Sequence, residues 1–191
     1  MVRHCRKERD SGYTSLHDFT VYSDIFGKNP DSPDHIQALF SHLRHAMLFG
    51  VPQRSQTCSA QIREFTLIVK PLETDLVAYA ELSAYRGWGK NQHPIVQNYL
   101  HEFDPLTIAT EVPVWSNAEL NGTNGFIDII RVTPDWFIEV SDFKPNAAKE
   151  KKASQQVQKY IELLIESTGI DRKWFIGTYF DDTHSFIINN A

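Results

Sequence analysis

Apolar and polar positions follow a helical period through most of the first half of the chain. In the segment 34–48, apolar side chains recur every three or four residues, which predicts an amphipathic helix. The segment 93–103 has the same spacing and also predicts a helix. The segment 59–85 is mainly helical in pattern, although 64–70 could form a strand and Pro71 must interrupt or restart a helix. The first half is therefore expected to be mainly helical.

The pattern changes in the second half, where five segments are rich in β-branched and aromatic residues and are separated by turn-forming residues. These predicted strands are 107–115, 125–132, 136–143, 173–180 and 184–189. A long helix is predicted between the third and fourth strands, with Asn146 as a cap at its start and Gly169 at its end. Its apolar stripe comprises Ala153, Val157, Tyr160, Ile161 and Leu164. The predicted order is helices, three strands, a helix and a terminal hairpin.

This order indicates an α/β (α+β) fold with a central mixed β-sheet flanked by helices and a helical N-terminal part. Residues 1–33 are polar and irregular in pattern, 34–85 are mainly helical, and 86–191 contain the strands. No internal repeat or low-complexity linker divides the sequence, so residues 1–191 are expected to form one domain.

Composition is that of a folded globular protein, with 41% hydrophobic, 12% aromatic and 23% charged residues. Cys5 and Cys58 are the only cysteines, which leaves no disulfide framework and no four-cysteine zinc or iron–sulfur site. The start of the chain lacks the apolar core of a signal peptide, and no apolar run approaches the roughly 18 residues of a membrane span. We therefore expect a cytoplasmic protein that does not associate with membranes.

The net charge of −5 is unusual for a nucleic-acid-binding protein, because such proteins commonly have a basic balance. This net charge does not exclude binding of nucleic acid. A metal-dependent site for a polyanion needs local carboxylates, and the metal ion restores positive charge where the substrate lies.

The predicted strand 136–143 ends with an acid and a base on the same face, since side chains alternate along a strand and Asp142 and Lys144 are two positions apart. Asp128 lies on the preceding strand. An antiparallel connection through 133–135 would place residue 128 across from about residue 140, and so Asp128 diagonal to Asp142 at roughly 7 Å between backbones. Two carboxylates could then share one cation.

Two neighbouring buried acids are costly unless a cation compensates their charge. Oxygen ligands without cysteine or paired histidines favour Mg²⁺ or Mn²⁺ over Zn²⁺. Lys144 could then orient or help to deprotonate an attacking water and stabilise a pentavalent phosphate. The alternative is that Asp142 and Lys144 form a surface salt bridge at a strand end, with Asp128 as an acid close to a turn.

The arrangement of Asp128, Asp142 and Lys144, followed at once by a helix, resembles the PD-(D/E)xK nuclease superfamily. Its RecB-like exonuclease branch, which includes the RecB and AddAB nuclease domains and CRISPR-associated RecB-like nucleases, places Q-x-x-x-Y on that helix. Gln156 and Tyr160 supply this motif here, one helical turn apart. The resemblance covers the chain from about residue 86 onward.

This resemblance implies a restriction-endonuclease-like core with Asp128 and Asp142 as metal carboxylates and Lys144 as the catalytic lysine. The backbone carbonyl of Phe143 is a further metal ligand in this interpretation. Gln156 and Tyr160 would contact the DNA backbone or brace the site. The cysteines that hold an iron–sulfur cluster in several relatives are absent from the sequence, so we expect no cluster.

The branch also commonly has a histidine at the start of the helix before the strands. His93 fits that position best, with His101 as the competitor, and His93 could equally be a polar residue before Pro94. Glu111 matches an acid that often opens the first core strand, although a surface glutamate on an edge strand is the alternative. His93 and Glu111 are therefore additional candidate metal ligands.

The leading hypothesis is a Mg²⁺- or Mn²⁺-dependent deoxyribonuclease, an exonuclease that acts on DNA ends or single strands. The alternatives are a structure-specific or restriction-type endonuclease of the same superfamily, a nucleic-acid-binding protein that does not cut, and an unrelated small-molecule binder. Candidate partners are DNA, a second copy of the chain, and a protein of DNA recombination or replication.

Overall fold

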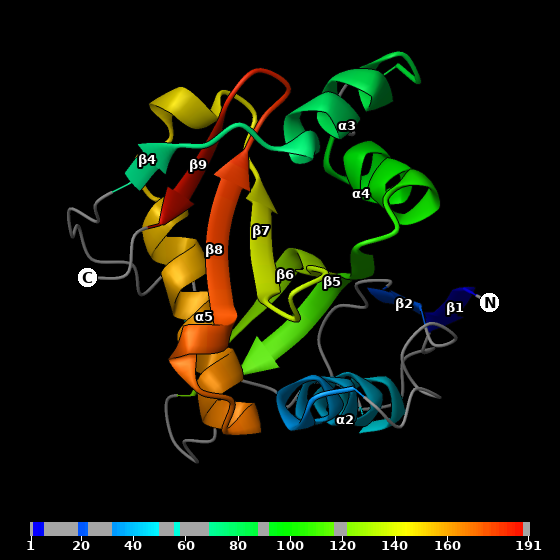
Figure 1. The fold of residues 1–191 in the computed structure, drawn as a ribbon, viewed down its shortest axis with the longest axis vertical. Helices are drawn as coiled ribbons and strands as arrows, with labels where there is room; N and C mark the ends of the chain where they lie inside the picture. The colour runs from blue at the N-terminus through cyan, green and yellow to red at the C-terminus, as the bar shows by residue number, and fades with distance from the viewer. Residues whose placement is uncertain are drawn as a thin grey trace.

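The computed structural model describes residues 2–5, 19–22, 32–49, 56–57, 69–87, 92–116 and 122–188. They form an α/β fold, in which a mixed β-sheet has four helices packed against it (Figure 1). The strands of the sheet follow the order β1-β2-β5-β6-β7-β8-β9-β4, and the short strand β3 (Gln56–Thr57) pairs with β6. The predicted fold class is confirmed at this level.

Six strands make up the larger part of the sheet. They are β5 (Thr107–Trp115), β6 (Thr123–Val132), β7 (Ile138–Phe143), β8 (Phe175–Phe180), β9 (Ser185–Ile188) and β4 (Val69–Pro71). The first three pair in antiparallel order, β7 and β8 are parallel, and β8 and β9 form an antiparallel hairpin. Figure 1 shows β7 and β8 side by side with the same direction. The order predicted for the second half of the chain is therefore confirmed.

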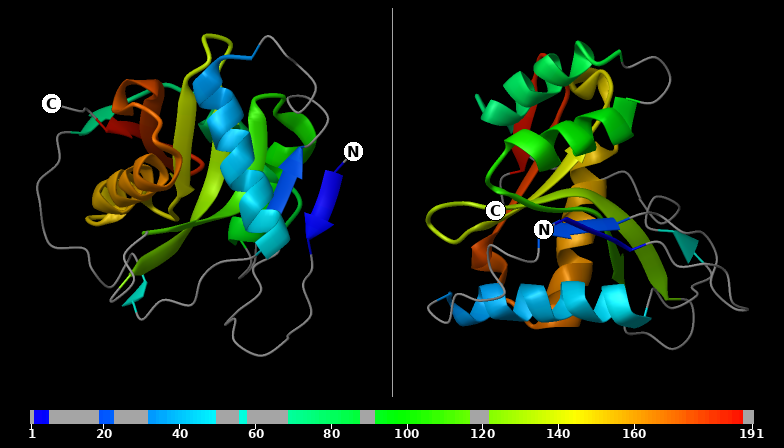
Figure 2. Two further views of the ribbon diagram at one scale, coloured as in Figure 1. Left: turned by 90° about the horizontal axis from the view of Figure 1, so that it is seen from below. Right: turned by 90° about the vertical axis from the view of Figure 1, so that its right-hand side faces the viewer.

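The helices are α2 (Asp34–Phe49), α3 (Asp75–Ala84), α4 (Gln92–Phe103) and α5 (Ala153–Thr168), with two short 3₁₀-helices, η2 (Ala147–Lys149) and η3 (Arg172–Trp174). Apolar side chains of α2 and α5 share one core with the sheet, whereas α3 and α4 form a second core with Ile129, Phe143 and Phe180. Figure 2 shows α3 and α4 together at one end of the sheet and α2 at the other. None of the helices that the structure describes is long and apolar enough to cross a membrane.

Two details of the predicted elements are corrected, and the strand alternative for 64–70 is confirmed at the end of that run. Residues 1–33 are not wholly irregular, because β1 (Val2–Cys5) and β2 (Phe19–Tyr22) extend the sheet beside β5. In the predominantly helical segment, the end of the run 64–70 belongs to strand β4, while 58–68 lie outside the described residues. Asn146 does not cap the long helix, since it has a left-handed backbone before η2 and α5 begins only at Ala153.

Helix α5 lies very close to the sheet at Gly177 of β8. A Cβ atom at this position would lie 3.1 Å from Val157 Cγ1, 3.2 Å from Ile161 Cδ1 and 3.1 Å from Ile188 Cδ1. Val157 and Ile161 belong to the predicted apolar stripe, which is buried as expected, and Gly169 ends the helix with a left-handed backbone. The absence of a side chain at Gly177 therefore sets the distance between α5 and the sheet.

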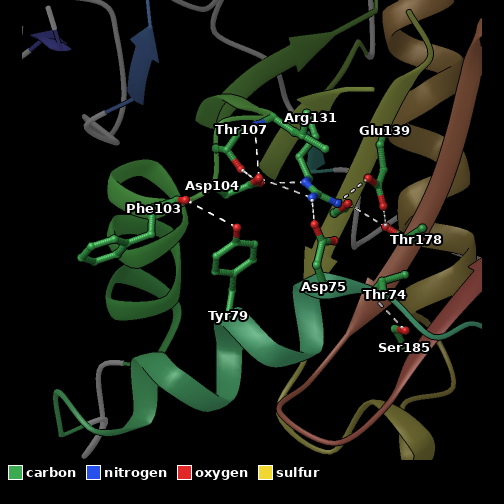
Figure 3. A network of polar contacts seen from close by, with 12 residues as sticks. Thr74, Asp75, Tyr79, Phe103, Asp104, Thr107, Arg131, Glu139, Thr178 and Ser185 are labelled. Atoms are coloured by element: carbon green, nitrogen blue, oxygen red, sulfur yellow. Dashed lines mark hydrogen bonds and ion pairs between the residues drawn. The ribbon is translucent and has the colours of Figure 1, made fainter. Parts of the chain in front are cut away.

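On the opposite face, a buried arginine connects β6 and β7 with the two helices that cover them (Figure 3). The Arg131 side chain is 3% exposed and forms ion pairs of 2.8 Å with Asp75, Asp104 and Glu139. Asp75 begins α3 and Asp104 directly follows α4, so one guanidinium joins both helices to the sheet. Thr107 donates a further hydrogen bond of 2.6 Å to Asp104.

Negative charge exceeds positive charge in this network, because three carboxylates surround one guanidinium. Burial acts to lower the pKa of Arg131, but the surrounding carboxylates, first Glu139, raise it overall. Burial also raises the pKa of Glu139, against the effect of Arg131 and of a hydrogen bond from Thr178. Arg131 is therefore permanently charged, and its removal would leave buried acids without compensation.

We expect Gly177→Ala to lower the free energy of unfolding by about 1 to 3 kcal/mol, because the added methyl group overpacks the contact with α5. Ile161→Val removes one of the crowded atoms. The double variant should therefore lose less stability than the sum of the two single variants. Urea unfolding of the four proteins measures this coupling, and strict additivity would contradict the proposed contact.

We expect Arg131→Met to cost about 3 to 5 kcal/mol of stability near pH 7, because it leaves buried carboxylates unpaired. Without Arg131, the pKa of Glu139 rises further above its unfolded value, so the folded state binds the extra proton and its stability falls as pH rises. The deficit relative to wild type should therefore be smaller near about pH 4.5 than near about pH 7.

The matched control is Arg86→Met. Arg86 is 41% exposed and pairs with the exposed Glu102, so its loss should cost less than about 1 kcal/mol at either pH. Urea unfolding at both pH values measures the two variants, and a deficit for Arg131→Met that is independent of pH would contradict the electrostatic explanation.

Candidate active site

The pairing of β6 with β7 brings Asp128 and Asp142 together. Ile129 lies opposite Ser141 and Ile130 opposite Val140, and the same register places Asp128 directly across from Asp142 at the end of the ladder. The predicted register, with residue 128 across from about residue 140, is therefore wrong by two positions. Because the shift is even, both acids remain on the same face, and they are adjacent rather than diagonal.

Asp142 is a buried carboxyl group with little hydrogen bonding. Its side chain is 1% exposed, and Lys144 Nζ lies 2.8 Å from its Oδ2 atom. Within the described part of the chain, neither of its carboxylate oxygens accepts a hydrogen bond of good geometry. Burial, followed by the negative charge of Asp128, raises the pKa of Asp142 well above its usual range, and Lys144 offsets only part of this effect. The position therefore favours an additional cation.

The carboxylate of Asp128 has more hydrogen-bonding partners than that of Asp142. Its Oδ2 atom accepts a hydrogen bond of 2.9 Å from the backbone N–H of Phe143 and lies 3.1 Å from His93 Nδ1. Burial acts to raise the pKa of Asp128, but His93, Asp142 and Lys144 lower it overall. The pKa values of the two acids thus shift in opposite directions, and Asp142 is the one whose protonated form is favoured by its surroundings.

Of the two candidate histidines, His93 reaches the acids. It is the second residue of α4, and its ring contacts Phe143 edge-on at 5.2 Å between centroids. His101 is buried within the same helix. In this arrangement His93 is a hydrogen-bonding partner of Asp128, and its role as a metal ligand stays a prediction.

Glu111 lies beside Asp128 on β5, between the paired positions Thr110–Ile129 and Val112–Ile127. Its backbone has φ 54°, a left-handed conformation that is strained for a residue with a side chain. Gln97 of α4 donates a hydrogen bond of 2.6 Å to its carboxylate. Glu111 is therefore held next to the acid pair on an inner strand rather than at a free sheet edge.

Gln156 and Tyr160 lie on one face of α5, as their spacing predicts. Gln156 Nε2 donates a hydrogen bond of 2.6 Å to Tyr160 Oη, and Tyr160 is buried in the core between α5 and the sheet. This hydrogen bond holds the two side chains against each other. Their contact with DNA stays a prediction, as does ligation by the backbone carbonyl of Phe143.

The acid pair fits a hard divalent cation that keeps most of its water ligands. In the described residues, no group of three or more His, Cys, Asp or Glu side chains is arranged to hold a metal ion. Among the described residues, the buried Asp142 oxygens accept no hydrogen bond of good geometry, and they are nevertheless suited to a cation. Mg²⁺ commonly binds through one or two carboxylates and completes its shell with water and substrate phosphate, whereas Zn²⁺ needs three or four protein ligands.

Two further side chains at the site were not found from the sequence. Gln97 positions Glu111, and its buried place on α4 beside a strained strand residue has no local sequence signal. Tyr179 lies opposite Asp142 in the parallel β7–β8 pairing and is 5% exposed. Burial raises its pKa, and the charge of Glu150 adds to the effect. Only the pairing of β7 with β8 brings Tyr179 to the acid.

Comparison with known proteins leaves the family open, because no protein-family model matches the chain and no curated protein matches it significantly.

We expect Mg²⁺ or Mn²⁺ to stabilise the wild-type protein against thermal unfolding, by about 2.7 kcal/mol at a free concentration of about 100 times Kd. Asp142→Asn should lose this stabilisation, because an amide offers the cation no negative charge. Differential scanning calorimetry with and without metal measures the shift. Asp135→Asn, on the exposed connection between β6 and β7, is the matched control and should behave like wild type. An equal shift in Asp142→Asn and wild type would contradict binding at the acid pair.

Proposed function

We propose that the chain is a metal-dependent deoxyribonuclease of the PD-(D/E)xK type, related to the RecB-like exonucleases. The observation that carries the proposal is the buried pair of Asp128 and Asp142 with the Lys144 amine 2.8 Å from Asp142. Asp128 lies within β6, and Asp142 and Lys144 lie at the carboxyl end of the neighbouring strand β7. The three residues have the order and spacing of the superfamily motif. Action on DNA ends or single strands follows from the resemblance to the exonuclease branch.

In this proposal Asp128 and Asp142 hold Mg²⁺ or Mn²⁺. When bound, the ion would neutralise charge on the scissile phosphate and promote formation of the nucleophile from water. Asp128 is already ionised and oriented by Phe143 N–H and His93, so it provides a fixed negative charge. A positive charge beside Asp142 would favour its ionised form, against the burial and the neighbouring Asp128 that raise its pKa.

Lys144 has a role that follows from its charge. Burial acts to lower the pKa of its amine, but Asp142 raises it overall, with smaller contributions from Asp128 and Glu150. The side chain is thus an ammonium group near neutral pH. A partly buried ammonium suits orientation of the attacking water and stabilisation of the pentavalent phosphate, rather than removal of a proton in the free protein.

The energetic cost of the arrangement also supports a chemical role. A buried carboxyl pair lacking full hydrogen bonding and a strained glutamate in a central strand each lower stability. Both lie at the same point of the β5–β6–β7 meander. Such costs cluster at sites of catalysis and ligand binding more than in structural ion pairs.

We expect purified protein to release nucleotides from linear DNA when Mg²⁺ or Mn²⁺ is added. Asp142→Ala and Lys144→Ala should each reduce the rate by at least about 100-fold, because each removes charge that stabilises the transition state. The matched controls Asp135→Ala and Lys173→Ala remove the same charges from exposed positions and should retain activity. Gel analysis of end-labelled products measures the rate.

Comparison of linear, covalently closed circular and single-stranded DNA tests the mode of cleavage. An exonuclease should leave closed circles intact, and cutting of circles would instead support the endonuclease alternative. If the wild type cuts none of these substrates, nor branched DNA, with either metal, the nuclease proposal is wrong.

A further inference from the structure

The connection between β7 and α5 carries a group of exposed lysines. Lys149, Lys151 and Lys152 are all exposed, and Glu150 is the only acid among them. Within the part of the chain that the structure describes, none of the three amines forms an ion pair, in contrast to Lys144, Lys159 and Lys173. In a chain of net charge −5, this is a local concentration of uncompensated positive charge.

These lysines follow the acid pair closely along the chain. They come five to eight positions after Lys144, and η2, which ends with the first of them, begins four positions after the end of β7. Glu150 of the same segment also raises the pKa of Lys144 and that of Tyr179, the strand partner of Asp142. The basic segment 149–152 therefore belongs to the connection that leaves the carboxyl end of β7, where the candidate active site is.

The segment is also held in place. Lys144 N donates a hydrogen bond of 2.8 Å to the Phe180 carbonyl, and Ala147 N donates one of 2.7 Å to Asp181 Oδ2. Asp181 Oδ1 accepts further hydrogen bonds from the backbone of Thr183 and His184, so this buried acid joins the connection to the β8–β9 turn. The lysines thus extend from a fixed turn rather than from a loose loop.

We propose that Lys149, Lys151 and Lys152 bind the phosphate backbone of the nucleic-acid strand whose scissile phosphate lies at Asp128 and Asp142. The inference rests on the proposed nuclease function and adds a substrate contact to it. Ammonium groups on flexible stems interact with phosphates as point charges and do not read bases. The contact therefore favours any polynucleotide over a single nucleotide, without preference for sequence.

Salt dependence provides the test, because each phosphate contact releases counterions. Binding of a fluorescein-labelled oligothymidine of about 20 nucleotides is measured by anisotropy in EDTA, from about 50 to about 200 mM salt. A plot of log K against log salt concentration has a negative slope. For the triple variant Lys149→Gln, Lys151→Gln, Lys152→Gln, this slope should be shallower than that of the wild type by about 2. Over this range, wild type would then lose about 20-fold more affinity than the variant.

The matched control is Lys70→Gln, Lys159→Gln, Lys173→Gln, which removes the same charge from the exposed or half-exposed surface elsewhere. It should keep the wild-type slope. Equal slopes in the two triple variants, or no binding by the wild type, would overturn the proposal. Because no metal is present, the binding result is independent of cleavage, and a wild type that binds through these lysines but does not cut DNA contradicts only the nuclease function.

Discussion

The antiparallel pairing of β6 with β7 is the constraint on which the rest of the structure depends. One register sets Arg131 opposite Glu139 and, one position beyond the pair Ile129–Ser141, brings Asp128 beside Asp142. The arginine network fixes α3 and α4 against this hairpin, and α4 also brings His93 to the acid pair. A slip of one residue would turn each of these charged side chains to the other face of the sheet and separate it from its partners.

The two charged clusters differ in how they are compensated. Around Arg131, nearly every polar atom has a partner, and the guanidinium fork fits its three carboxylates. At the acid pair, Lys144 and His93 compensate part of the negative charge, and in the part of the chain that the structure describes the Asp142 oxygens accept no hydrogen bond of good geometry. The first cluster is complete within the protein and is therefore structural. The second would gain from another positive group, and for this reason we propose it as a site of ligand binding and catalysis.

Local patterns predicted most of the fold, since the helical period and the β-rich segments are properties of short windows. The shared face of Asp142 and Lys144 was also predictable, because alternation needs no tertiary information. The arginine network was not, since Asp75 and Arg131 are 56 residues apart and only folding brings them together. Likewise, Asn146 is a plausible helix cap by type, but η2 intervenes before α5. The charged residues inside apolar strand runs were the one available signal for buried ion pairs.

Strand β4 at the margin of the sheet has a consequence for self-association. Its exposed residues include Lys70 and Pro71, and it pairs on its other side with β9. Proline offers no N–H group to an incoming strand, and a charged lysine resists burial between two sheets. This edge therefore discourages the continuous strand-to-strand addition through β4 that leads to aggregates.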